Sequence, residues 1–110
     1  MPKFMSQFSY SEASVKGMVR KPQDRRAAAE KLFGAAGGKI ESMYFCFGEY
    51  DGVVITDFPS DVAAASAILA VGSSGAFSRI KTTVLISMED SVAAMEGANK
   101  IASEYVAPSN

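Results

Sequence analysis

Two neighbouring segments of the sequence, residues 39–47 and 52–58, are apolar on both of their alternating sets of side chains. In the first segment one set contains Met43, Phe45 and Phe47. The other set contains Ile40, Tyr44 and Cys46. The second segment repeats the pattern with Val53 and Ile55 against Val54 and Phe58. Because successive side chains of a strand point to opposite faces, a sheet built from these strands is predicted to be buried on both faces.

The expected elements follow the order β-α-β-β-α-β-α. Strands are predicted at residues 3–10, 39–47, 52–58 and 77–87, and helices at 12–20, 24–36, 61–71 and from 88 to about 104. Pro22 is expected to break the first helical run and open the second. The order is that of an α+β, ferredoxin-like fold, in which a four-stranded antiparallel sheet has helices on one face. We expect one domain over residues 1–110, with residues 107–110 as a frayed tail.

A chain of 110 residues has no further element to cover the second face of such a sheet. We therefore expect a face-to-face homodimer, a dimeric α/β barrel, whose two sheets enclose a core or a cavity. Residues 62–71 form an uncharged helical run, and a helix that is apolar all round is normally covered on more than one side. This run predicts that the dimers associate further.

The composition excludes several kinds of chemistry. The chain has no His, no Trp and a single Cys, Cys46, so it has no Ser-His-Asp triad, no His-ligated haem, no common zinc site and no internal disulfide. We accordingly expect no cofactor and no metal. A net charge of −1 gives no field that would concentrate nucleic acid or an anionic membrane. The apolar run 62–71 is half the length needed to cross a bilayer, and no signal-like segment is present, so a cytoplasmic location is expected.

The segment Phe47-Gly48-Glu49-Tyr50-Asp51-Gly52-Val53-Val54-Ile55 closely resembles the signature of the GYD-domain family, small bacterial proteins of dimeric α/β-barrel type. The resemblance extends to Arg25-Arg26-Ala27, to Gly37-Gly38-Lys39 and to residues 72–83, and so covers most of residues 1–88. It implies the fold and the dimer. It implies no reaction, because the family has none assigned.

A more distant similarity runs to the ligand-sensing domain of leucine-responsive transcription regulators. It rests on the same Gly-x-Tyr-Asp hairpin and on the strand Lys81-Thr-Thr-Val-Leu-Ile86. Those domains bind amino acids between subunits, so the similarity implies a small-molecule ligand. The chain has no room for their DNA-binding helices, and a direct regulatory role is not expected.

A row of polar side chains is expected on the sheet face opposite the helices. If the first and last strands pair, then Gln7, Ser9, Lys81 and Thr83 share that face and look into the dimer cavity. There Lys81 could hold a carboxylate or enolate oxygen, with hydroxyls and an amide beside it. The alternative places Lys81 at the edge with its amine in water.

The hairpin residues Tyr50 and Asp51 and the strand residue Tyr44 are further candidates for the site. Asp51 could be a general base at the mouth of the barrel, or it could accept backbone N–H groups and fix the hairpin. Glu49 and Tyr50 could join it or form a solvated turn tip, and Tyr44 could be a core aromatic or a hydroxyl donor. No residue is assigned a catalytic role.

Two functions remain open at this point. In the first, the barrel binds a small organic ligand such as an amino, keto or aromatic acid, with or without cofactor-free catalysis. In the second, the chain is a structural or protein-interaction module whose second sheet face serves only dimerisation. Residues 16–31 contain six of the eleven basic residues, and we interpret this run as a solvated helix face rather than an anion or nucleic-acid site.

Overall fold

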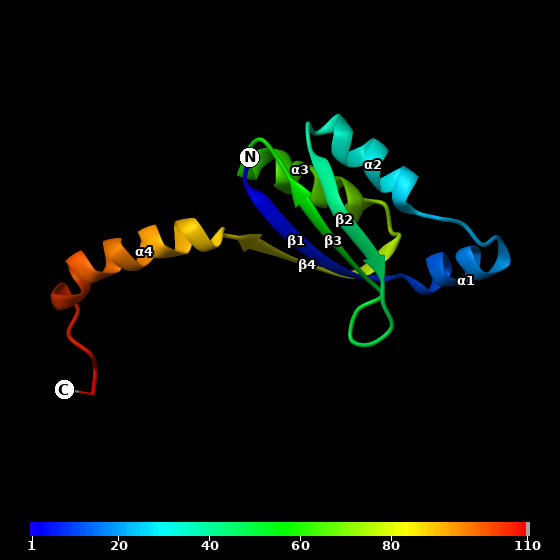
Figure 1. The fold of residues 1–110 in the computed structure, drawn as a ribbon. Helices are drawn as coiled ribbons and strands as arrows, with labels where there is room; N and C mark the ends of the chain where they lie inside the picture. The colour runs from blue at the N-terminus through cyan, green and yellow to red at the C-terminus, as the bar shows by residue number, and fades with distance from the viewer. Residues whose placement is uncertain (110) are drawn as a thin grey trace.

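The fold is described for residues 1–109 by a computed structural model. Its elements, in chain order, are β1 (Lys3–Tyr10), α1 (Glu12–Arg20), α2 (Arg26–Ala35), β2 (Lys39–Phe45), β3 (Gly52–Asp57), α3 (Asp61–Ser73), β4 (Phe77–Leu85) and α4 (Met88–Ile101), followed by the short 3-10 helix η1 (Ala102–Glu104). The strands form one antiparallel sheet in the order β2-β3-β1-β4. The expected ferredoxin-like α+β fold is therefore confirmed (Figure 1).

One face of the sheet packs against α2 and α3, and we call it the helix face. The strands contribute aromatic and aliphatic side chains to this core, α2 contributes Phe33, and α3 contributes Ala64 and Ala67. Phe58 is 1% exposed, and its ring packs edge-on against Phe4 and Phe33 at centroid distances of 6.0 and 5.6 Å. The small alanines let α3 approach the sheet closely, so the three rings fill the core.

A bulge in β2 corrects one of the parities expected from the sequence. Ile40 pairs with Thr56 and Ser42 with Ile55, so Glu41 is an extra residue in the ladder. The extra residue turns Ile40 to the same face as Met43, and both pack against the core. The strand also ends at Phe45 rather than at residue 47, which leaves Phe47 95% exposed in the hairpin loop.

The helix starts follow the expected caps at three of four places. Ser11, Ser60 and Ser87 each accept a hydrogen bond from the backbone N–H three residues later. The expectation that Pro22 opens the second helical run is wrong, because α2 begins at Arg26. The N-cap residue is Arg25, which makes no side-chain cap hydrogen bond, and Asp24 Oδ1 just before it accepts the Arg26 N–H at 2.8 Å. A short polar segment therefore separates α1 from α2.

The last helix leaves the body of the molecule. Figure 1 shows α4 continuing outward from the end of β4, at the opposite end of the molecule from α1, and none of its residues is buried. The radius of gyration is 17.9 Å, against about 13 Å for a compact chain of this length. Asn110, the last residue of the predicted frayed tail, lies outside the described residues. Over residues 1–109, the helices are all too short or too polar to span a bilayer.

Candidate functional site

Within residues 1–109 no helix covers the second face of the sheet, which we call the open face. On it Gln7 lies opposite Lys81, Met5 opposite Thr83 and Ser9 opposite Arg79 across the β1–β4 ladder. On the other side of β1, Val53 lies opposite Gln7 and Ile55 opposite Met5. The expected row of Gln7, Ser9, Lys81 and Thr83 thus lies together, beside a half-buried apolar stripe of Met5, Val53 and Ile55.

The two ends of the open face differ in charge. At one end Lys3 donates to Asp57 Oδ1 at 2.8 Å and to Glu41, and these hydrogen bonds raise the pKa of its ammonium. At the other end Lys81 is exposed, and within residues 1–109 it forms no ion pair. The Lys3 end is neutralised by carboxylates, whereas the Lys81 end presents a free cation beside an amide and two hydroxyls.

The hairpin loop between β2 and β3 closes the Lys81 end of the open face. Arg79 lies over the ring of Tyr50, 4.2 Å from its centroid. Its guanidinium also donates to the backbone carbonyl of Glu49 and lies 3.8 Å from the Glu49 carboxylate. The loop tip is therefore attached to β4. Sequence reasoning missed Arg79, because only the strand register places it beside a loop 30 residues away.

Asp51 and Tyr44 lie far from Lys81. Asp51 Oδ2 accepts the Tyr10 N–H at 2.9 Å, which ties the hairpin to the end of β1. The Asp51 carboxylate thus accepts a backbone N–H group, as in the interpretation that this residue fixes the hairpin. Tyr44 shares a row with Gln7 and Lys81, but Val53 lies between it and Gln7. Three strand spacings, about 14 Å, therefore separate Tyr44 from Lys81.

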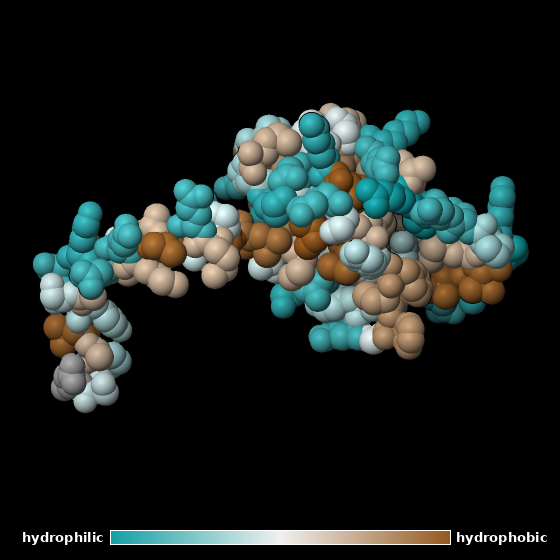
Figure 2. Space-filling model, in the orientation of Figure 1, coloured by the Kyte–Doolittle hydropathy of each residue, from teal (hydrophilic) through white to brown (hydrophobic). Residues whose placement is uncertain are grey.

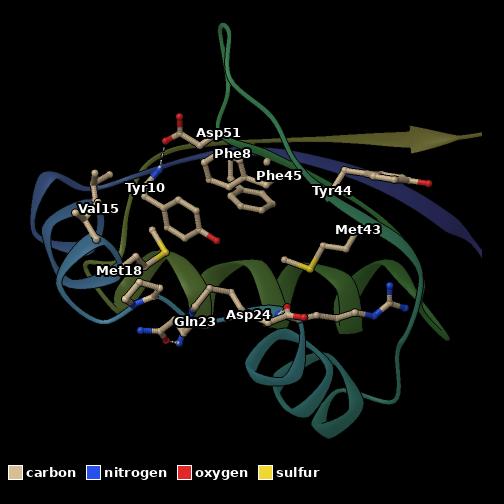
Figure 3. A pocket seen from close by; sticks show the side chains of 15 residues that line it. Phe8, Tyr10, Val15, Met18, Gln23, Asp24, Met43, Tyr44, Phe45 and Asp51 are labelled. Carbon is tan, nitrogen blue, oxygen red and sulfur yellow. Dashed lines mark hydrogen bonds between the residues drawn. The ribbon is translucent and has the colours of Figure 1, made fainter.

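A separate cavity opens on the helix face, beside α1. It has a volume of about 700 Å³ and is bordered by α1, by residues 22–26 and by β2 (Figure 3). The Tyr10 side chain reaches into it, and burial, followed by the nearby Asp51 carboxylate, raises the pKa of the phenol against the opposing effect of Arg25. A second cavity of about 360 Å³ between α2 and α3 shares Phe8, Tyr10, Arg25 and Met43 with the first. Sequence reasoning did not identify either cavity.

The titratable side chains are dispersed rather than clustered. Among residues 1–109 no three Cys, Asp or Glu side chains gather in a way that could hold a metal ion. The carboxylates of Glu41 and Asp57, at one end of the sheet, are both occupied by Lys3. Within residues 1–109 the open face therefore offers hydrogen-bond donors and the unpaired ammonium of Lys81, which suit an anionic ligand better than a cationic one.

Comparison with solved structures shows the same fold in several proteins of low sequence identity. A transcriptional regulator of Neisseria meningitidis, NMB0573, in complex with L-Met aligns with a TM-score of 0.56 at 12% identity, covering 79% of this chain and 51% of the regulator. The hypothetical protein PHS023 from Pyrococcus horikoshii aligns with a TM-score of 0.54 at 16% identity, covering 79% and 92%. The protein TTHA0845 from Thermus thermophilus gives 0.53 at 12% identity, covering 79% and 95%.

Sequence comparison identifies the family. Among curated proteins no relative matches this chain. The sequence profile described as the GYD domain matches residues 4–95, which is most of the chain and includes the Gly48 to Asp51 hairpin on which the resemblance rests. The protein therefore belongs to the GYD domain family.

Proposed function

We propose that the protein binds a small organic acid on the open face, at the Lys81 end, and that a second copy of the chain covers the site face to face. The observation that carries this proposal is the free ammonium of Lys81 next to Gln7, Ser9 and Thr83. A carboxylate accepts hydrogen bonds from an ammonium, an amide and hydroxyls, and charge-assisted bonds of this kind are the strong ones. The apolar remainder of the ligand would lie on the stripe of Met5, Val53 and Ile55.

The second copy is part of the proposal for a physical reason. An exposed Lys and two hydroxyls hold an anion weakly in water, because screening reduces the interaction. Covering the site with an apolar sheet lowers the local dielectric and strengthens the same contacts. The half-buried apolar stripe on the open face supplies the surface that would pack against its counterpart.

The ligand class is supported by one structural neighbour. The Neisseria meningitidis regulator of the same fold is a complex with L-Met. An amino acid combines a carboxylate with a small side chain, as does a keto or aromatic acid. We therefore propose amino, keto and aromatic acids as the class to test.

The test is a thermal-shift and calorimetry panel of amino, keto and aromatic acids with three proteins. At least one acid should raise the melting temperature of the unmodified protein. Lys81→Gln should weaken the binding of that acid by about tenfold or more, because a charged hydrogen bond contributes about 1.5–3 kcal/mol. Lys31→Gln, at a lysine on α2 that is also exposed, is the matched control and should bind like the unmodified protein.

Two results would overturn the proposal. One is a panel in which no acid shifts the melting temperature, or in which the two lysine variants lose affinity equally. The other is the mass of a single chain, measured by light scattering at micromolar concentration. That mass would contradict the covering of the site by a second copy. A dimer that binds no acid would favour the alternative, a module whose open face serves only dimerisation.

A further inference from the structure

Helix α1 has an apolar side that the other described residues, 1–109, leave largely exposed. Val15, Met18 and Val19 fall on one side of the helix, and none of the residues of α1 is buried. These side chains border the 700 Å³ cavity of the helix face together with Phe45, which is 72% exposed at the end of β2. We call this open cavity the α1 groove. Figure 2 shows the hydrophobic surface gathered over α1.

Helix α4 has an uncovered apolar side of its own. Met88, Val92 and Met95 are spaced four and three residues apart, so they lie along one stripe, and they are 81%, 52% and 65% exposed. Figure 2 shows hydrophobic and hydrophilic residues on different sides of the projecting helix. A 14-residue helix with such a stripe is marginal on its own in water, because tertiary packing supplies most of the stability of a helix.

The two segments carry opposite charge. Residues 88–104 contain four acidic residues, Glu89, Asp90, Glu96 and Glu104, against Lys100. Residues 12–26, which form α1, the connection to α2 and the first residue of α2, contain five basic residues, Lys16, Arg20, Lys21, Arg25 and Arg26, against Glu12 and Asp24. Opposite potentials on two surfaces steer association and fix the register of the contact. This pairing also gives the basic run of residues 16–31 a partner.

The exposed area of the chain fits a missing partner. The accessible surface is 7,816 Å², against about 5,800 Å² for a compact protein of this mass. The excess of about 2,000 Å² exceeds the roughly 800 Å² per partner of a standard interface. Both the open face and the α4 stripe contribute to this excess, so a second copy could cover both.

We propose that α4 of one copy seats its apolar stripe in the α1 groove of a second copy, and that the exchange is reciprocal. In one chain α4 and the groove lie at opposite ends of a molecule 59 Å long, so α4 does not fill the groove of its own chain. A twofold arrangement brings each α4 to the groove of the other copy and fills both grooves. The contact closes the cavity into which Tyr10 reaches with side chains from the partner.

Cysteine trapping between two differently tagged copies tests the contact, with Cys46 replaced by Ser in both. One copy carries Met95→Cys on α4 and the other carries Val19→Cys in the groove. Mild oxidation should join them at least about tenfold faster than it joins Met95→Cys to Ser66→Cys, because seating raises the effective concentration of the two thiols. Ser66 is the matched control, since it is exposed on α3 and does not border the groove.

The outcomes separate this proposal from the proposed function. Equal trapping at Val19 and Ser66 overturns the α4 contact, and a dimer mass retained in the same sample leaves the open-face dimer standing. Val92→Asp together with Met95→Asp places charges on the stripe. This double variant should reduce the dimer fraction at micromolar concentration while the circular dichroism of the body is retained. An unchanged dimer fraction in the double variant would also contradict the seating of α4.

Discussion

The two faces of the sheet are built from alternate residues of the same strands, yet they are covered to very different degrees. On the helix face Phe4, Phe8 and Val54 are at most 7% exposed. Their neighbours Met5, Gln7 and Val53 on the open face are only half-buried. The sequence of a strand determines which of its side chains can be buried. Whether they are buried depends on what other elements, or other copies, the fold brings to each face.

The largest expected difference between the faces comes from truncating one residue on each. Phe58→Ala should lower the free energy of unfolding by about 4 kcal/mol, since the ring is enclosed by Phe4 and Phe33. Ile55→Ala should lower it by only about 1–2 kcal/mol in a dilute sample, because that side chain is half-exposed in the single chain. Urea denaturation measures both values.

Two further measurements support the comparison of Phe58 and Ile55. Phe58→Leu retains most of the apolar volume and keeps the measurement possible if Phe58→Ala does not fold. Repeating the Ile55→Ala measurement at higher protein concentration should increase the loss if a second copy covers the open face, because unfolding is then coupled to dissociation. Equal losses for Phe58→Ala and Ile55→Ala in dilute samples would show that the two faces do not differ.

A smaller effect is expected from adding one carbon to the helix face. A Cβ on Gly52 would lie 2.5 Å from Cε2 of Phe8, closer than real side chains approach. Gly52→Ala should therefore destabilise the protein by about 2 kcal/mol, because the Phe8 ring has to leave its packed position. Gly48→Ala is the control, since a Cβ there meets nothing within 4 Å. Similar melting temperatures for both variants would contradict tight packing around Phe8.

Much of the fold could be predicted from the sequence because local signals and the global pattern agree. The serine caps, the helix stop at Gly37 with its φ of 82°, and the alternation in β1 each have a local physical cause. The bulge at Glu41 could not be predicted, because an extra residue is tolerated only where the partner strand permits it. The predicted start of α2 is wrong, because the helix begins only at Arg26, whose N–H is bound by the Asp24 carboxylate rather than left to a proline at the first turn.

The candidate site could be predicted in part. Pairing of the outer strands follows from the fold, so Gln7, Ser9, Lys81 and Thr83 could be placed on one face. Arg79 could not be assigned, because its contacts with Tyr50 and Glu49 depend on how the hairpin loop bends. The α1 groove also could not be predicted from the sequence. It exists because α1 is separated from α2 and projects past the sheet, which is a matter of three-dimensional placement.

The smallest expected effect concerns Tyr10, which lies at the border between the helix-face core and the α1 groove. Burial raises the pKa of its phenol above 10.0, and the Asp51 carboxylate adds to this. The folded protein therefore holds the proton more tightly than the unfolded chain does. The contribution of Tyr10 to stability is complete below the unfolded pKa and is lost as the pH rises through the folded pKa.

Tyr10→Phe should remove this part of the alkaline loss of stability. Denaturation at several values from about pH 9 to 11 should give free energies of unfolding that fall less steeply for the variant than for the unmodified protein. Lys3, whose pKa is also raised, contributes the same alkaline loss to both proteins, so the difference between them isolates Tyr10. Tyr105→Phe, an exposed tyrosine beyond α4, should follow the unmodified protein. Parallel curves for Tyr10→Phe and the unmodified protein would mean that the groove leaves the phenol as solvated as it is in the unfolded chain.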